Sequence, residues 1–307
     1  MGVLRMGYIH IRVTDLEAAK KHYIGTMGFT PTLEIGRTVY LKGWDEWDHH
    51  SVVLEEGGVG VKKFGFKVES PDDIDVIENK ARVFGVKTER MSRGDNPEVS
   101  DGVRMTLPST HVVEVYYDQT YVGIEVGGVN PDAFPRHLAG VGAPRIDHAL
   151  MVAEDVNVNE RFFMDVMDFY QVERLVPDLD HTECSLASWL SVGNRGHDIA
   201  ILGGPPGTDG KIHHFAFQLY GWSEVLRASD IMSMDEVHLD VGPTRHGITR
   251  GQTTYFFDPS GNRNEVFSDG YVAYRDRPTT LWTADRLPKG IFYHKRQLNE
   301  EYTTVFT

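Results

Sequence analysis

A strand, a tight turn and a returning strand can be read in the stretch Tyr255-Phe-Phe-Asp-Pro-Ser-Gly-Asn-Arg-Asn-Glu-Val-Phe267. Residues 253–257 are rich in β-formers, and Asp258-Pro259-Ser260-Gly261 after them is a strong turn signal. On the return strand, Glu265 lies where the sequence is apolar enough to be half buried. A carboxylate that points from a strand into a fold needs a cation or a metal as its partner. We therefore expect Glu265 to meet such a partner inside the protein.

An earlier segment of the chain repeats this hairpin. Glu265 follows Pro259 by six residues, and Glu114 follows Pro108 at the same spacing. Four further landmarks recur in the same order, namely a starting strand, a Met-x-Phe at the end of a helix, and two later strands. The matched segments are 7–13 with 145–152, 27–29 with 167–169, 50–55 with 197–202, and 61–66 with 212–217. Five landmarks in one order indicate an internal duplication.

The repeated pattern predicts the architecture. Each half reads as strand, helix and strands, and then the same again. We expect an α+β fold of two tandem domains, each made of two βαβββ modules whose mixed sheets curl around a cavity. The domains are expected at 1–130 and 145–270, because the intervening segment contains Gly127-Gly128 and three prolines. The tail, 271–307, is expected to pack on the second domain.

Two helices of the first half have readable starts. Thr14-Asp-Leu-Glu17 forms a capping box, and its helix is expected to run through about Met27. Ser70-Pro71-Asp72-Asp73 combines a cap, a proline at the first helical position and acids at the positive end of the dipole. This second helix is expected to stop at Gly85. Each helix follows a predicted strand, as the βαβββ order requires.

The composition excludes several classes of protein. The 307 residues carry a formal net charge of −14, which argues against a nucleic-acid or anionic-membrane surface. The single cysteine, Cys184, excludes an internal disulfide and a cysteine-rich zinc site. We see no signal-peptide pattern and no run of eighteen apolar residues, so we expect a cytoplasmic, non-membrane protein. Fourteen histidines point instead toward imidazole chemistry.

The duplication lets the two halves serve as controls for each other. At the first strand, the mid-domain strand and the strand after the proline turn, the second half holds His148, His214 and Glu265. At these positions we align the first-half residues His10, Lys63 and Glu114. Two imidazoles and one carboxylate suit Fe(II) and leave the other face of the metal open. A lysine ammonium cannot ligate a metal at neutral pH. The metal site is therefore expected only in the second domain.

Alternation along the strand decides between His213 and His214, because adjacent residues face opposite ways. His214 shares a face with Ala216, whereas His213 lies on the face of Phe215 and Phe217. A small neighbour leaves room for a cavity, which favours His214 as the ligand. His213 is then expected to be a packed or rim histidine.

The motifs together resemble a known family. His148, the His213-His214 strand, Thr244-Arg-His-Gly-Ile-Thr249 and the segment 255–267 resemble the type I extradiol ring-cleaving dioxygenases of the vicinal oxygen chelate superfamily, most closely the catechol 2,3-dioxygenases. The resemblance extends nearly end to end. It implies that His148, His214 and Glu265 ligate Fe(II), with Mn(II) less favoured. It also implies that His197 is an acid–base residue, and that His246 and Tyr255 hydrogen-bond substrate and oxygen atoms.

The resemblance further implies a reaction. This is the Fe(II)-dependent extradiol, or meta, cleavage of catechol or a substituted catechol by dioxygen to a 2-hydroxymuconic semialdehyde, in the degradation of aromatic compounds. An imidazole near neutrality can take a proton from a catechol and return it later. The family also implies a homo-oligomer, a tetramer. Two alternatives stay open, namely another metal-dependent enzyme of this scaffold, such as an isomerase, and a non-catalytic module that binds an aromatic compound or a metal.

Overall fold

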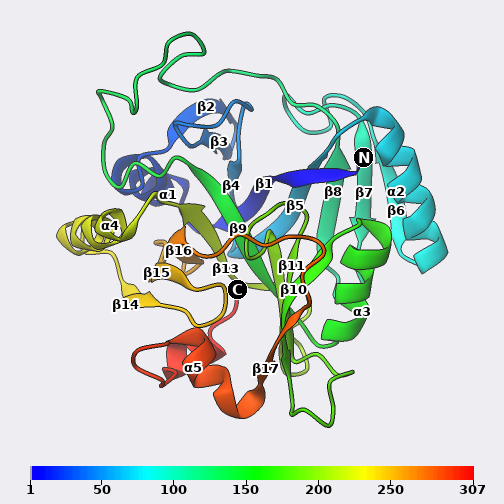
Figure 1. The fold of residues 1–307 in the computed structure, drawn as a ribbon. Helices are drawn as coiled ribbons and strands as arrows, with labels where there is room; N and C mark the ends of the chain where they lie inside the picture. Colours follow the sequence, from blue (N-terminus) through cyan, green and yellow to red (C-terminus); the bar gives the residue numbers. More distant parts are fainter. Residues whose placement is uncertain (1) are drawn as a thin grey trace.

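The computed structural model describes residues 2–307, which form two large mixed β-sheets with helices packed around them (Figure 1). The first sheet has the strand order β2-β3-β4-β1-β5-β8-β7-β6. Its strands are β1 (Val3–Val13), β2 (Thr30–Ile35), β3 (Thr38–Lys42), β4 (Val52–Glu56), β5 (Gly60–Val68), β6 (Lys87–Met91), β7 (Gly102–Thr106) and β8 (Val112–Tyr116). The whole first sheet precedes residue 118 in the chain.

The second sheet repeats this topology and adds one strand at its edge. Its order is β14-β15-β16-β13-β9-β12-β11-β10-β17, which is the first order read backwards with β17 appended. Its strands are β9 (Arg145–Ala153), β10 (Tyr170–Val176), β11 (Ala187–Ser191), β12 (Ile199–Gly203), β13 (Lys211–Gln218), β14 (Leu239–Arg245), β15 (Gly251–Phe257), β16 (Arg263–Asp269) and β17 (Thr280–Thr283). The expected α+β fold with a duplicated, mixed-sheet architecture is confirmed.

The strand registers correct one alignment made from the sequence. Ile9 in β1 pairs with Val52 and Phe64, and Ala149 in β9 pairs with Ile199 and Phe215 at the equivalent places. Ile9 is therefore the counterpart of Ala149. It follows that Tyr8 is the first-half counterpart of His148, and the expected match of His10 with His148 is wrong by two residues. A slip of two keeps every side chain on its face of the sheet, so alternation along the strand could not reveal it.

Helices occupy the expected places, with one difference in capping. The first is α1 (Leu16–Lys20), which continues as a π-helix, η1 (Lys21–Thr26). Its cap is Asp15, whose side chain accepts a hydrogen bond of 3.0 Å from the amide of Ala18, so the box expected to begin at Thr14 is wrong by one residue. Aspartate is a better N-cap than threonine, and Asp15 directly precedes the first helical residue.

The other helices follow the repeat. The capping box at Ser70 is present at the start of α2 (Pro71–Phe84), which ends at Gly85 with φ of 95°. The second half contains α3 (Val156–Arg161), a second π-helix η2 (Phe162–Val166), and α4 (Trp222–Met234). The tail contains a short 3-10 turn η3 (Ala284–Arg286), α5 (Leu287–Ile291) and α6 (Glu300–Thr304). Within residues 2–307, no helix has the length and apolarity that a membrane crossing requires.

Aromatic side chains join the two halves in one continuous core. Phe29 lies 4.8 Å from Phe217 between ring centroids, and Phe66 lies 6.2 Å from Phe163. The buried cluster that contains these rings runs through both sheets. The chain between β8 and β9 crosses the top of the view in Figure 1 as a long loop. The domain limits 1–130, 145–270 and 271–307 stay predictions.

The tail returns across the second sheet. β17 pairs in parallel with β10 and extends the sheet, and the orange-red α5 lies near it at the bottom of Figure 1. Arg263 in β16 fastens the last helix, donating hydrogen bonds to the carbonyls of Glu301 at 2.9 Å and Val305 at 2.8 Å. The tail is thereby placed over the ends of β13, β15 and β16, where the candidate site lies.

Candidate active site

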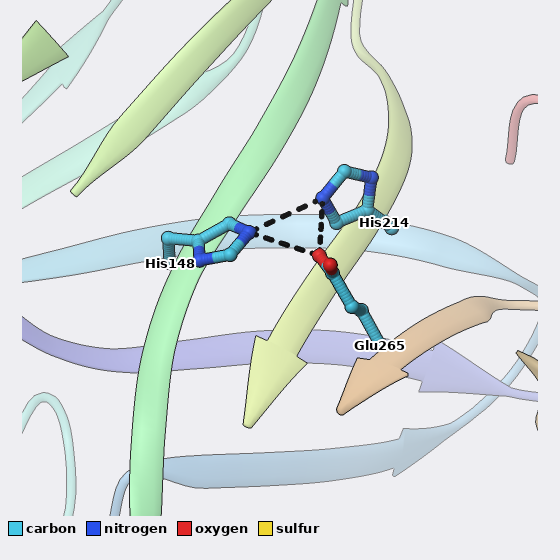
Figure 2. Close-up of side chains that lie close together, drawn as sticks. All are labelled: His148, His214 and Glu265. Carbon is cyan, nitrogen blue, oxygen red and sulfur yellow. Dashed lines mark hydrogen bonds and ion pairs between the residues drawn. The ribbon is translucent and has the colours of Figure 1, made fainter. Parts of the chain in front are cut away.

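Three neighbouring strands bring His148, His214 and Glu265 together (Figure 2). β13 lies between β9 and β16, so one side chain from each strand can reach the same point. The Nε2 atoms of His148 and His214 lie 3.0 and 3.1 Å from Glu265 Oε2, and 3.4 Å from each other. All three residues are buried. The other carboxylate oxygen of Glu265 accepts a hydrogen bond of 2.5 Å from Thr253.

This donor set fits a metal ion. Among residues 2–307 it is the group of His, Cys, Asp and Glu side chains whose ligand atoms lie close enough to hold one ion. Three donor atoms spaced this way would all lie about 2 Å from an ion placed beside their common plane, which is an ordinary metal–ligand distance. Two imidazoles and a carboxylate on one side leave the remaining positions free for other ligands.

The charges at this point favour a cation. Burial alone would raise the pKa of Glu265, but the imidazoles around it, His148 foremost, lower its pKa well below the usual value. Burial would lower the pKa of His148, but Asp147 and Glu265 raise it to about 9, whereas burial lowers the pKa of His214 to about 4. Without a metal, a proton on His148 therefore supplies the positive charge that Glu265 needs. A bound metal would replace that proton.

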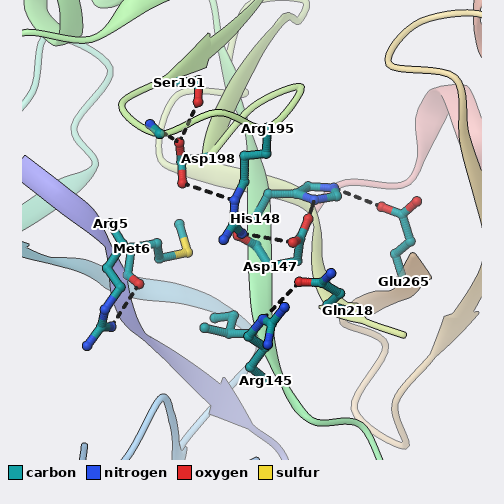
Figure 3. A network of polar contacts seen from close by, with 12 residues as sticks. Arg5, Met6, Arg145, Asp147, His148, Ser191, Arg195, Asp198, Gln218 and Glu265 are labelled. Atoms are coloured by element: carbon teal, nitrogen blue, oxygen red, sulfur yellow. Dashed lines mark hydrogen bonds and ion pairs between the residues drawn. The ribbon is translucent and has the colours of Figure 1, made fainter. Parts of the chain in front are cut away.

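A buried polar network holds His148 from behind (Figure 3). Asp147 Oδ2 accepts a hydrogen bond of 2.6 Å from His148 Nδ1, so Nε2 of the same ring is directed toward Glu265. Asp147 Oδ1 in turn accepts 2.8 Å from Arg195, whose Nε lies 3.7 Å from Asp198. A carboxylate behind a histidine ligand fixes its orientation and strengthens it as a donor. Sequence analysis missed Asp147, because neighbouring strand residues are expected to face apart.

His197, His246 and Tyr255 lie around the same centre. The ring centroid of His197 is 4.0 Å from that of His148, and Tyr255 pairs with Glu265 across β15 and β16. Burial, and then the positive charge on His148, lowers the pKa of His197 well below its usual value. Burial, and then the charge of Glu265, raises the pKa of Tyr255 well above its usual value. These shifts favour a neutral imidazole at His197 and a protonated phenol at Tyr255 near neutral pH.

The tautomer of His246 follows from its contacts. Its Nδ1 lies 2.5 Å from the carbonyl oxygen of Ile291, which can only accept, so Nδ1 carries the proton. Nε2 therefore accepts, at 3.0 Å, the hydroxyl proton of Tyr255. Ile291 belongs to α5, so the tail orients this pair.

All six residues predicted for the site line one small cavity of 30 Å³. The rest of its wall is mostly apolar and comes from both the sheet and the tail. These further residues are Leu150, Trp189, Ile248, Thr249, Phe267, Ile291 and Tyr302. An apolar wall around a few polar groups is typical of small-molecule sites. From the sequence we expected the tail to pack on this domain, but we assigned none of its residues to the site.

His213 points away from the three converging donors. Its Nδ1 lies 2.7 Å from Nδ1 of His214, and its Nε2 lies 2.8 Å from the carbonyl oxygen of Tyr302. The contacts of His214 with Glu265 agree with the choice of His214 as the candidate ligand. His213 is buried beside the site rather than placed at a rim.

The equivalent place in the first half is an ion-pair cluster. Glu114 accepts hydrogen bonds from Lys63 at 3.2 Å, Arg104 at 2.7 Å and Asn96 at 3.0 Å, and it also contacts the hydroxyl of Tyr8. His10, which we expected at this position, instead lies 2.9 Å from Glu55. The carboxylate here is partnered by two cations and two neutral donors.

Family models match both halves of the chain. Residues 145–266 match the Glyoxalase/Bleomycin resistance protein/Dioxygenase superfamily, and residues 62–120 match the Catechol 2,3-dioxygenase-like N-terminal domain. A metapyrocatechase from Pseudomonas sp. (strain CF600) is 41% identical over 100% of this chain and 99% of its own length. A manganese-dependent 2,3-dihydroxybiphenyl 1,2-dioxygenase from Geobacillus genomosp. 3 is 26% identical, over 95% of this chain and 94% of its own.

Solved structures give the same result. The 2,3-dioxygenase LapB from Pseudomonas sp. KL28 superposes with a TM-score of 0.88 at 39% identity, covering 93% of this chain and 99% of that one. Homoprotocatechuate 2,3-dioxygenase from Arthrobacter globiformis superposes with a TM-score of 0.87 at 26% identity, covering 99% and 91%. The similarity extends over both sheets of the fold.

Proposed function

Since this chain belongs to the metapyrocatechase family of extradiol ring-cleaving dioxygenases, within the glyoxalase and dioxygenase superfamily, we propose that it opens the ring of catechol or a substituted catechol with dioxygen. The product would be a 2-hydroxymuconic semialdehyde. The observation that carries this proposal is the convergence of His148, His214 and Glu265 with an imidazole base and a phenol in one apolar cavity.

The proposed metal is Fe(II), held by His148, His214 and Glu265. When bound, Fe(II) would bring the catechol oxygens and dioxygen together and let electrons pass between them. The ligand set is the one typical of non-haem Fe(II) oxygenases. Mn(II) is the competing metal, because one relative is manganese-dependent by name.

His197 is proposed as the acid–base residue. It is buried, burial lowers its pKa well below the usual value, and its ring lies against that of His148, so it is placed to take a hydroxyl proton from a substrate beside the metal. The same proton can be returned when the ring has opened. Tyr255 and His246 are proposed to hydrogen-bond the substrate and oxygen atoms. Tyr255 keeps its proton near neutral pH and can stabilise negative charge that develops on an oxygen.

The function is tested by adding catechol to protein loaded anaerobically with Fe(II) and then admitting oxygen. The expected result is a yellow ring-opened product, with oxygen consumed as it forms. A parallel sample loaded with Mn(II) compares the two metals at equal occupancy. Metal binding with no colour and no oxygen uptake across several catechols would contradict the proposal. That result would favour an isomerase-like enzyme or a binding module instead.

Two further expectations stay predictions. The tetramer that the resemblance implies can be measured by light scattering after size-exclusion chromatography. The expected cytoplasmic location can be measured by fractionating cells that express the chain.

A further inference from the structure

We propose that His213 is a positioning residue for the metal site. Hydrogen bonds between His213 and a carbonyl of the tail, and between His213 and the ligand His214, would fix the tautomer and orientation of the His214 ring. The inference rests on the proposed metal site but concerns a residue that does not line the cavity. Three groups form the relay: the carbonyl oxygen of Tyr302 in α6, the imidazole of His213 and the imidazole of His214.

The proton positions along this relay follow from the tail carbonyl. A carbonyl oxygen only accepts, so His213 must donate from Nε2 to Tyr302 O at 2.8 Å. In a neutral imidazole, the other nitrogen then accepts. His213 Nδ1 therefore receives the proton of His214 Nδ1 at 2.7 Å. This leaves Nε2 of His214 with a free lone pair, on the atom that lies 3.1 Å from Glu265 and 3.4 Å from His148.

Arg263 connects His213 to the tail. His213 is 1% exposed, and its backbone carbonyl accepts a hydrogen bond of 3.2 Å from Arg263. Arg263 also holds the tail through Glu301 and Val305, so the same cation keeps the carbonyl of Tyr302 in position.

The relay is present only in the half that has the complete donor set. In the first half, the counterparts of His213 and His214 are Lys62 and Lys63. Lys62 has a side chain 40% exposed and pairs with Glu55 at 2.6 Å, so it makes no comparable link. The two histidine ligands of the second half are thus held by different devices. Asp147 holds His148 from within the same strand, and the tail holds His214 through His213.

The test compares metal affinity in three proteins, by chelator competition with Mn(II) and anaerobically with Fe(II). The variant His213→Asn keeps an acceptor oxygen near the place of Nδ1, whereas His213→Phe keeps the ring volume without an acceptor. We expect His213→Phe to lose about 10- to 100-fold in metal affinity, and His213→Asn to stay close to wild type. Lys62→Phe is the matched control at the first-half counterpart and is expected to bind metal like wild type.

Equal affinity of His213→Phe and wild type would overturn the inference. Equal loss in the Phe and Asn variants would also overturn it, because packing and not the acceptor would then matter. Thermal unfolding of the metal-free variants shows whether each one folds. If His213→Phe does not fold, nitrogen NMR of wild-type protein remains decisive, since a His214 protonated on Nε2 contradicts the relay. A wild-type protein that binds no metal contradicts the proposed function itself, whereas the NMR result still tests the relay.

Discussion

The two halves place a glutamate at the same point of the same sheet and surround it differently. Glu265 faces two imidazoles, and Glu114 faces an ammonium, a guanidinium and a phenol. The registers make Tyr8 the counterpart of His148, Lys63 that of His214 and Arg104 that of Tyr255. The fold therefore supplies the position of the carboxylate. The residue types on the neighbouring strands determine whether it can bind a metal or is neutralised by protein cations.

The cavities in the two halves differ in the same sense. The space beside Lys63 and Arg104 measures 460 Å³ and is lined by charged and polar groups, whereas the space beside Glu265 measures 30 Å³. The tail accounts for part of this difference, because Ile291 and Tyr302 form part of the smaller wall. The half with the proposed metal site is also the half whose cavity the tail helps to line.

The largest difference between the halves is expected when each carboxylate is replaced by an amide. We expect Glu265→Gln to reduce metal affinity by more than about 100-fold, because removing a ligand must exceed the 10- to 100-fold cost of changing a residue behind one. We expect Glu114→Gln to leave metal affinity unchanged but to lower the free energy of unfolding by about 3–5 kcal/mol, because buried cations lose their partner. Bound metal by mass spectrometry and unfolding in urea measure the two effects. A metal loss in Glu114→Gln would contradict the assignment of roles.

The next contrast is between His50 and His197, which lie two residues before β4 and β12 respectively. His197→Gln is expected to keep its metal and lose about 10²- to 10⁴-fold in kcat, because a proton acceptor is missing. His50, its counterpart in the first sheet, is also buried, and His50→Gln should leave kcat unchanged. Turnover is measured by oxygen uptake on samples of equal metal content. Loss of metal from His197→Gln would refute its acid–base role.

Asp147 has no side-chain counterpart, since Gly7 occupies the equivalent position of β1. Asp147→Asn is expected to lower metal affinity about 10- to 100-fold, because an amide supports His148 less strongly than a carboxylate. Asp48→Asn serves as a control. Asp48 is a buried acid away from the proposed metal site, and its Oδ1 pairs with Lys67 Nζ at 2.9 Å. Metal titration monitored by calorimetry compares the two. Equal affinities in both variants would exclude a positioning role for Asp147.

The smallest effect is expected from removing the ammonium of the first half. In Lys63→Met, Glu114 keeps Arg104, Asn96 and Tyr8 as partners. We therefore expect a loss of about 1–3 kcal/mol in the free energy of unfolding, with metal content and kcat unchanged. Urea unfolding and metal analysis measure both. A second metal ion per chain in this variant would show that Lys63 alone keeps the first half empty.

Much of the arrangement around the two glutamates can be predicted from the sequence, because the same pattern occurs in both halves. The shared spacing from proline to glutamate locates both carboxylates, and the contrast of Lys63 with His214 predicts which half can bind a metal. The slip that matched His10 with His148 went unseen, because strand alternation repeats every two residues. Asp147 and the roles of the tail were missed for another reason. Asp147 acts through a β-bulge, since Asp147 and His148 of β9 lie opposite the single residue Ala216 of β13. The tail acts through backbone carbonyls. Neither feature has a signature in the residue order.

The two π-helices bear on the order of events in the evolution of the chain. A π-helical turn closes its hydrogen bonds over one more residue than an α-helical turn, so each contains a surplus residue. η1 follows α1 directly, and η2 follows α3 in the same way. Two independent insertions at the same place require more events than a single insertion that was then duplicated. We infer that the surplus residue was already present in the ancestral unit before the gene doubled. A single-copy relative whose equivalent helix is regular throughout would argue against that order.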